Sequence, residues 1–238
     1  MRSVLITAAN SGLGLPTMMA LLHRGCRVVA TTRNSKGEET IRRAAQKYIE
    51  SGGLTIEYLD LSENELPSSI VAALQHVDGV INNAGTEADL SQTRGCGKGS
   101  ALDMIWSDFE QAMWINANGA RRIMKHCVPF MSERNYGRIV NVSSARASLG
   151  NIVGEVGAPC YDISKTVLNA LTAHMGHELQ GSNVLVNSLC PGWCATSMGG
   201  ANAPDTPEQG ASRILHVLDL PANGPNGKFF MNNQVVPF

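Results

Sequence analysis

The sequence lacks the features that mark membrane, nucleic-acid-binding and metal-binding chains. No apolar run approaches the roughly 20 residues of a membrane-spanning helix. With 19 basic and 20 acidic residues the formal net charge is -1, so no charge excess favours a nucleic acid or a membrane surface as partner. We therefore expect neither partner. A strand signal close to Met1 also leads us to expect no signal peptide.

Cysteine shows no pattern that predicts a metal site or a disulfide framework. The six cysteines are scattered, with no Cys-x-x-Cys pair and no histidine at metal-ligand spacing; they lie at positions 26, 96, 127, 160, 190 and 194. This distribution predicts reduced thiols in a cytoplasmic protein and no bound metal.

What the sequence does contain is enough apolar material for one large core. Of its 238 residues 43% are hydrophobic and only 16% are charged, which favours a folded domain over a disordered chain. No internal repeat, low-complexity tract or linker divides it, so we expect a single domain over residues 1–238.

Strand and helix signals alternate along the chain. Predicted strands cover residues 4–7, 27–31, 54–60, 77–82, 137–142, 184–189 and 228–231. Predicted helices cover residues 14–24, 38–50, 66–76, 102–131 with a break at 116–119, 161–179 and 207–218. Strands rich in Val, Ile and Leu favour a parallel sheet with helices on both faces. We expect a doubly wound α/β fold whose ligand crevice lies at the carboxyl ends of the strands.

The segment TAANSGLG, residues 7–14, follows the first predicted strand and opens the first predicted helix. Backbone N–H groups and the helix dipole favour an anion at such a place, and Gly12 and Gly14 let a ligand approach the backbone. An ordinary turn between a strand and a helix explains the same residues equally well, because a glycine pattern by itself is weak evidence.

The segment YDISK is more informative. It places Tyr161 and Lys165 at positions i and i+4, hence on one face of a helix. A free tyrosine has a pKa of about 10, and a neighbouring ammonium lowers it towards the range in which tyrosine works as an acid or a base. Without further motifs, Tyr161 and Lys165 would be interpreted as an exposed pair of a kind that is common on helices.

Other polar motifs end predicted strands at the same edge of the sheet. NVSS brings Ser143 and Ser144 to the end of one strand, and NNAG, residues 82–85, ends another. Asn116 lies at the helix break in INANG, where an exposed carbonyl could hold a water, and CPGWCAT places Thr196 after the sixth strand. Each motif also has a plain capping or turn role. Their joint occurrence at one edge favours a site.

Taken in order, TAANSGLG, NNAG, the Asn116 segment, NVSS, YDISK and CPGWCAT resemble the motif set of the short-chain dehydrogenases/reductases over essentially the whole chain. CPGW followed by Thr196, and the ending GKFFMNNQVVPF, are most similar to the NADPH-dependent carbonyl reductase branch. The resemblance implies a Rossmann-type fold, with a cofactor half at about residues 1–140 and substrate-facing elements at about 144–160 and 190–215. It also implies a homodimer or homotetramer formed through the two long helices.

The resemblance implies a role for each matching residue. Tyr161 would be the general acid in carbonyl reduction, supported by Lys165, which also binds the ribose. Ser144 would orient the substrate, and Asn116 would anchor the water of a proton relay. The implied cofactor contacts are Thr7, Asn10, Ser11, Gly12, Leu13, Gly14, Arg33, Asp60, Leu61, Asn83, Ala84, Gly85, Tyr161, Lys165, Pro191, Gly192 and Thr196. The implied substrate contacts are Ser144, Tyr161 and Trp193.

Two local features refine these expectations. The segment VVATTRN has Thr32 where NAD-dependent enzymes place an acid, with Arg33 beside it, which favours NADP(H) while NAD(H) stays open. Ala8 stands where such loops often carry their first glycine. We expect Ala8 to have a negative φ, with the pyrophosphate over Gly12 and Gly14.

The expected function is therefore NADP(H)-dependent reduction of a ketone or aldehyde. An NAD(P)-dependent alcohol dehydrogenase working in the oxidative direction and a cofactor-binding regulator without catalysis are the alternatives. Trp193, Met198 and Ile152 predict a largely apolar substrate pocket, and Arg146 is expected to face solvent or to have a structural role. Residues 198–203 are expected to form a lid with Trp193, and residues 86–100 to shape the pocket or an interface.

Overall fold

The computed structural model describes residues 2–87, 101–152 and 158–238, and the side chains of residues 151 and 152 lie outside that description. The strands are β1 (Ser3–Ile6), β2 (Arg27–Thr32), β3 (Leu54–Tyr58), β4 (Gly79–Asn82), β5 (Gly137–Val142), β6 (Val184–Cys190), β7 (Phe229–Met231) and β8 (Gln234–Val236). The helices are α1 (Gly14–His23), α2 (Ser35–Glu50), α3 (Ser68–Leu74), α4 (Trp106–Ala112), α5 (Gly119–Glu133), α6 (Leu149–Ile152), α7 (Pro159–Glu178) and α8 (Pro207–Leu218). A π-helical segment, Met113–Asn118, joins α4 to α5, and short 3-10 turns cover Ala101–Asp103 and Ala145–Ala147.

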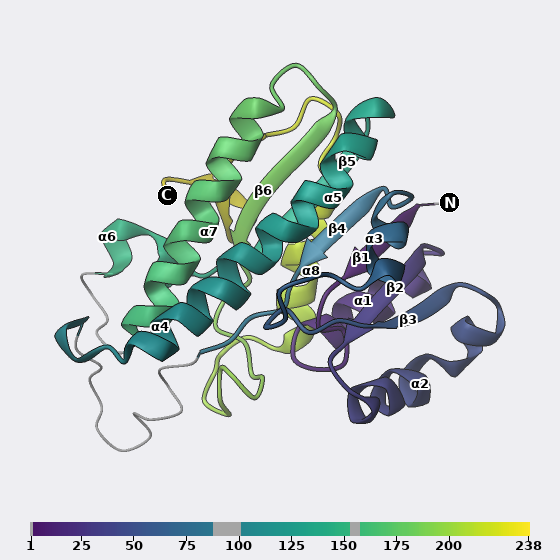
Figure 1. The fold of residues 1–238 in the computed structure, drawn as a ribbon, viewed down its shortest axis with the longest axis horizontal. Coiled ribbons are helices and arrows are strands. Elements are labelled where there is room, and N and C mark those ends of the chain that lie inside the picture. Colours follow the sequence, from purple (N-terminus) through teal and green to yellow (C-terminus); the bar gives the residue numbers. More distant parts are fainter. Residues whose placement is uncertain (1, 88–100, 153–157) are drawn as a thin grey trace.

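One eight-stranded sheet organises the domain, in the order β3-β2-β1-β4-β5-β6-β7-β8. All neighbouring strands are parallel except β7 and β8. The order reverses between β1 and β4, so the connections leaving these two strands diverge and open a crevice at their carboxyl ends. The predicted doubly wound fold is confirmed (Figure 1).

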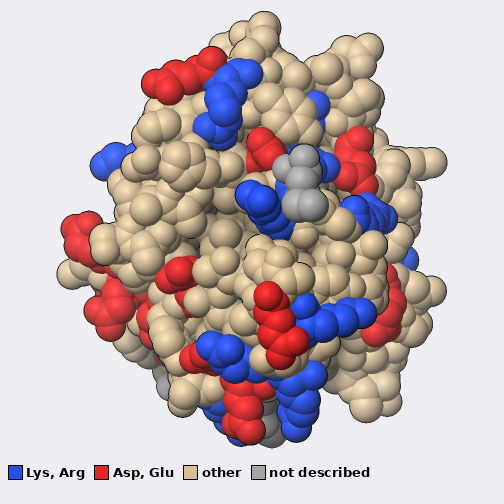
Figure 2. Space-filling view, turned by 90° about the vertical axis from the view of Figure 1, so that its right-hand side faces the viewer, with Lys and Arg blue, Asp and Glu red and all other residues tan. Residues whose placement is uncertain are grey.

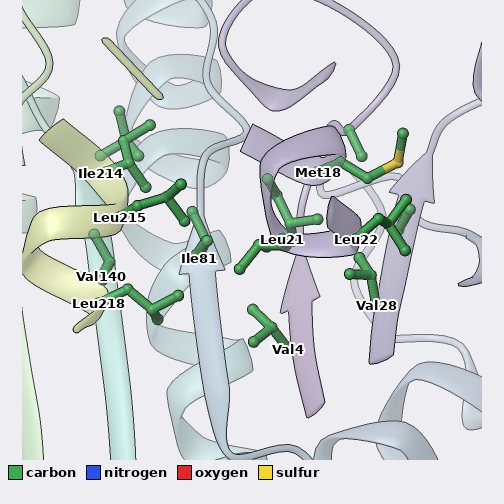
Figure 3. Close-up of a cluster of buried hydrophobic side chains, with 14 of the residues drawn as sticks. Val4, Met18, Leu21, Leu22, Val28, Ile81, Val140, Ile214, Leu215 and Leu218 are labelled. Carbon is green, nitrogen blue, oxygen red and sulfur yellow. The ribbon is translucent and has the colours of Figure 1, made fainter. Parts of the chain in front are cut away.

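Both faces of the sheet are covered by helices, which explains why β4, β5 and β6 are buried at every residue rather than at alternate ones. In β1, Val4 and Ile6 pack into a cluster with α1, α2 and α8, whereas Leu5 packs into a second cluster with α3 and α5. Figure 3 shows the first cluster, in which Leu21 and Leu22 of α1 and Ile214 and Leu215 of α8 meet the sheet. In Figure 1, α5 and α7 lie in front of β5 and β6.

The predicted elements differ from the observed ones mainly at their ends. The strand 137–142 and the helix 207–218 are confirmed at both ends, and α8 begins at Pro207 because Thr206 and Gln209 form a capping box. Strand β8 was not predicted, although Asn232 and Asn233 have the positive φ angles of a tight hairpin turn. Helix α6 was not predicted either, and the expected helix break is a π-helical segment.

Basic and acidic side chains are interspersed on the face that Figure 2 shows, in keeping with the small net charge of the chain. Within the described residues, every helix is too short or too polar to cross a membrane.

We predict that Gly176→Ala destabilises the fold. A Cβ at Gly176 in α7 would lie 2.3 Å from the Cα of Gly227, so helix and loop could not keep their present contact. The substitution should lower the free energy of unfolding by about 1–3 kcal/mol, measured by urea unfolding. Gly150→Ala is the control, because nothing lies within 4 Å of its Cβ position. Equal effects of the two substitutions would contradict the packing argument.

Candidate active site

A cavity of about 810 Å³ runs along the carboxyl edge of the sheet. The β1–α1 loop and the ends of β2 and β3 line one end, and the ends of β5 and β6 with Tyr161 and Lys165 line the other. The segment after β4 lies between them. The site is thus assembled where the sheet order reverses, at the position that the strand order dictates.

The β1–α1 loop departs from expectation at Ala8. Its φ is +53°, in the left-handed region, so the predicted negative φ is wrong. The conformation is held from both sides: the Ala8 N–H donates to the Thr31 hydroxyl at 3.3 Å, and its carbonyl accepts from the Asn83 amide at 3.2 Å. It also aims the Ala8 carbonyl at helix α1, where a Cβ on Gly14 would lie only 2.1 Å from that oxygen. Gly14 is therefore required by the turn itself.

Thr7 ties this loop to the segment after β4. Its buried hydroxyl accepts hydrogen bonds from the N–H groups of Asn83 and Ala84, at 2.9 and 2.8 Å. The Asn83 amide donates back to the Thr7 carbonyl at 2.9 Å. These contacts fix two walls of the cavity relative to each other.

At the end of the cavity beside β2 and β3, the lining residues include Arg33 and Asp60. Thr32 is buried and carries no charge, and α2 begins just beyond it with Asn34 as its N-cap. The Asp60 carboxylate accepts two hydrogen bonds from Ser62, at 2.9 Å from the N–H and 2.7 Å from the hydroxyl. Although partial burial opposes it, these hydrogen bonds and the charge of Arg33 hold the pKa of Asp60 below its usual value. The Arg33 guanidinium thus acts electrostatically on this carboxylate.

At the other end, α7 presents Tyr161 and Lys165 to the cavity. Both are buried, and the Lys165 ammonium donates to the Val142 carbonyl at 2.7 Å and lies 5.7 Å from the centre of the Tyr161 ring. The lowered pKa expected for Tyr161 beside an ammonium is not found: burial raises the pKa of Tyr161 above its ordinary value, the Glu87 carboxylate raises it further, and a hydrogen bond with Ser144 lowers it only in part. Burial lowers the pKa of Lys165 to about 8, against the opposing effect of Glu87.

The two serines after β5 are distinguished by their surroundings. Ser144 lines the cavity and hydrogen-bonds the Tyr161 side chain, while its hydroxyl also accepts the N–H of Arg146 at 3.2 Å. The Ser143 hydroxyl instead lies 3.5 Å from the Lys165 backbone carbonyl, to which it donates. Of the two, Ser144 is the hydroxyl beside Tyr161.

Arg146 forms a bidentate ion pair with Asp162, at 2.6 and 2.9 Å, and the Asp162 side chain is only 6% exposed. This pair ties the turn after β5 to the first turn of α7. It supports the structural role expected for Arg146.

Asn116 acts through its side chain. Its Oδ1 accepts the Thr86 N–H at 2.8 Å, and its Nδ2 donates to the Thr86 carbonyl and to the Ser164 hydroxyl, both at 2.9 Å. The π-helical segment brings this buried amide between α7 and the segment after β4. Asn116 therefore clamps two parts of the site together.

The segment after β6 forms the remaining wall. Arg213 fixes its turn by donating to the Pro191 carbonyl at 2.6 Å and pairing with Asp205 at 2.7 Å. The Trp193 indole is 58% exposed and donates to the Gly199 carbonyl at 2.7 Å. The Thr196 hydroxyl already accepts the Gly199 N–H at 3.1 Å, and its methyl group lies 3.7 Å from the position that a Cβ on Gly12 would take.

The structure brings nearly all the predicted site residues to one cavity. The exceptions among them are Gly14, which packs behind the loop, and Asn116, which lies behind the wall. Residues 88–100 and 153–157, which hold most of the predicted loop and part of the predicted substrate-facing segment, lie outside the described residues. Glu87 was missed; its signal was an acidic residue two positions after NNAG, at the end of a strand.

A Rossmann-type sheet with a Tyr-Lys-Ser group at its carboxyl edge defines the class of protein. The family model for short chain dehydrogenase matches residues 2–207, and the chain belongs to this family of oxidoreductases.

Relatives place it within that family. It is 27% identical over 283 residues to carbonyl reductase [NADPH] 1 of Oryctolagus cuniculus, covering 98% of this chain and 97% of the relative. It is 25% identical over 292 residues to short-chain dehydrogenase/reductase 1 of Saponaria officinalis, covering 100% and 96%. The structure of the carbonyl reductase Sniffer of D. melanogaster superposes with a TM-score of 0.82 at 25% identity, covering 100% and 98%. The chain is thus close to the carbonyl reductase branch.

We predict that Ala8→Gly stabilises the apoprotein. Glycine adopts a φ of +53° without the penalty of about 1 kcal/mol that alanine pays, so the free energy of unfolding should rise by up to about 1 kcal/mol. Ala9→Gly is the matched control: Ala9 is fully buried and its φ is not positive, so its substitution should destabilise. Urea unfolding compares them. An Ala8→Gly protein as destabilised as Ala9→Gly would show that Ala8 is not strained.

Proposed function

We propose that this chain is an NADP(H)-dependent oxidoreductase that reduces a ketone or aldehyde to the alcohol. One observation carries the proposal: a single cavity joins the β1–α1 loop to the group of Tyr161, Lys165 and Ser144. Membership of the short chain dehydrogenase family and similarity to a protein named as an NADPH carbonyl reductase support it.

The cavity fits a dinucleotide. Loop residues from Asn10 to Leu13 line the cavity at the N-terminus of α1, where the positive end of the helix dipole favours a pyrophosphate. Asp60 and Leu61 would border the adenine half, and Asn83, Ala84 and Gly85 the centre of the cofactor. Pro191, Gly192 and Thr196 would border the nicotinamide.

The end beside β2 favours a 2′-phosphate. Buried Thr32 puts no carboxylate where a 2′-phosphate would lie, and Arg33 can pair with such a group. The N-terminus of α2, only two residues after Arg33, adds its positive dipole end. Asp60 lies close to Arg33 and competes for its charge, which leaves NAD(H) usable at lower affinity.

In the proposed mechanism the reacting carbonyl lies between Ser144 and Tyr161. The bound dinucleotide supplies the hydride that the carbonyl carbon accepts. Ser144 donates a hydrogen bond to the carbonyl oxygen, and Tyr161 gives its proton to that oxygen as negative charge develops there. Lys165 stabilises the resulting phenolate, since its ammonium is already fixed beside the ring by the Val142 carbonyl. Because its surroundings raise the pKa of Tyr161, the acid is protonated at neutral pH.

The alternatives have less support. Oxidation of an alcohol uses the same residues in reverse, with Tyr161 as the base, and the raised pKa of Tyr161 places that reaction at higher pH. A regulator without catalysis has no need of the Tyr161, Lys165 and Ser144 arrangement. The cytoplasmic location, the oligomeric state and the single-domain division stay predictions.

Tyr161→Phe tests the mechanism. Loss of the general acid should reduce carbonyl reduction by NADPH by about 10²- to 10⁴-fold, while NADPH binding stays nearly unchanged. Turnover with a panel of ketones and aldehydes and cofactor fluorescence measure the two effects. Tyr58→Phe, on the exposed end of β3, is the control. Full activity of the Tyr161 variant would remove Tyr161 from the mechanism, and binding of NADPH without any turnover in the native protein would favour the regulator.

Arg33→Ala tests the cofactor preference. Loss of a charge-assisted hydrogen bond should weaken NADPH binding by about 10- to 100-fold and leave NADH binding nearly unchanged. Titration calorimetry with both cofactors measures the ratio, and Arg43→Ala, exposed on α2, is the matched control. An equal loss for both cofactors would contradict a contact between Arg33 and the 2′-phosphate.

A further inference from the structure

The segment that follows β4 crosses directly over the catalytic lysine. A Cβ on Gly85 would lie 3.3 Å from the Lys165 Nζ and 3.2 Å from the Asn116 Oδ1. The next residue, Thr86, is held at both its N–H and its carbonyl by the Asn116 side chain, at 2.8 and 2.9 Å. The residue after that is Glu87, which lines the same cavity as Tyr161 and Lys165.

The clamp is itself fixed to α7. The Asn116 Nδ2 also donates to the hydroxyl of Ser164, the residue next to Lys165, at 2.9 Å, and Asn116 is only 2% exposed. The position of the Glu87 backbone therefore follows from the helix that carries Lys165. Such a connection keeps the backbone that leads into Glu87 beside the helix that carries Lys165.

Charged and titratable groups reach Tyr161 and Lys165 from four elements. Among the described residues, Asp162 comes from α7, Arg146 from the turn after β5, Cys190 from β6, and Glu87 from the segment after β4. Asp162 is engaged by Arg146 in the bidentate ion pair, and the Cys190 thiol is neutral because burial raises its pKa. Of the carboxylates in the described residues, Glu87 is the one that acts on both Tyr161 and Lys165.

A buried ammonium without a counter-charge tends to lose its proton. The Lys165 Nζ is held by the neutral carbonyl of Val142, which is a weaker partner than a carboxylate. A negative charge nearby favours the ammonium and disfavours the phenolate of Tyr161. A carboxylate at this place thus favours the protonated form of Lys165 and the protonated form of Tyr161.

We propose that Glu87 is a positioning residue for the proton transfer: as the counter-charge of Lys165, it keeps that lysine charged and Tyr161 protonated until the proton is used. The inference rests on the proposed function for its meaning in turnover. Its electrostatic content concerns only side chains of this chain and can be tested without cofactor.

The first experiment titrates Lys165 in the apoprotein. The ¹³C shift of its ε-carbon is followed against pH by NMR and assigned with Lys165→Arg. The pKa of Lys165, about 8 in the native chain, should fall by about one unit in Glu87→Gln and stay near its native value in Glu87→Asp. Glu110→Gln, which removes an exposed carboxylate on α4, is the control and should leave the pKa of Lys165 unchanged. An unchanged titration in Glu87→Gln would overturn the proposal.

The second experiment measures the pH dependence of kcat/KM for carbonyl reduction by NADPH. The alkaline limb reports the coupled Tyr161 and Lys165 pair, and it should move to lower pH by about one unit in Glu87→Gln but not in Glu87→Asp or Glu110→Gln. A lower rate at every pH with the limb in place would contradict the proposal and indicate a merely structural role.

The two proposals fail in different ways. If the native chain reduces no carbonyl compound, the proposed function fails while the NMR titration still decides the role of Glu87. If Glu87→Gln does not fold, as judged by its thermal melt, Glu87→Asp and Glu87→Ser take its place in the titration. A Lys165 pKa in Glu87→Ser equal to that of the native chain would then overturn the inference.

Discussion

The buried ammonium of Lys165 is the interaction on which the site depends. It joins α7 to the carboxyl end of β5 through the Val142 carbonyl, and the ring of Tyr161 lies beside it. Burial makes the charge costly, so its surroundings must supply compensation. The carbonyl of Val142, the face of the Tyr161 ring and the charge of Glu87 each provide part of it. The same burial brings the lysine to a pKa of about 8, close to the range in which a proton relay can use it.

The other end of the cavity depends on hydrogen bonds between segments at the carboxyl ends of neighbouring strands. Thr7 and Asn83 join the loop after β1 to the segment after β4, and Thr31 of β2 holds Ala8 from the other side. These hydrogen bonds stabilise the positive φ of Ala8, a backbone conformation that alanine seldom adopts. The alanine in the glycine-rich loop therefore does not disable the turn, because the strain is local and Ala8 is held by hydrogen bonds from β2 and from the segment after β4. Its carbonyl, aimed at Gly14, explains why the later glycine is retained.

Asn116 links these two ends. Its side chain joins the segment after β4 to α7, and the π-helical segment places it there. That a backbone carbonyl at this helix break holds a water stays a prediction. The hydrogen bonds of the Asn116 side chain, in contrast, are part of the fold. Through these hydrogen bonds the segment carrying Glu87 is fixed to the helix carrying Tyr161 and Lys165. The charge arrangement of the site thus follows from packing as much as from the motifs.

The sequence by itself determined the order of strands and helices, the doubly wound sheet and the edge at which the motifs gather. It also determined that Tyr161 and Lys165 share a helix face, because periodicity and spacing along one element are local properties. Only the tertiary structure decided the φ of Ala8, the partners of Asn116 and the place of Glu87 in the cavity of Lys165. Each of these depends on contacts between segments distant in the chain. The hairpin strand β8 was missed because its three residues carry too short a pattern to predict a strand. The physical reason is the same in each case: local sequence sets local geometry, whereas hydrogen bonds and charges between elements exist only once the sheet has brought those elements together.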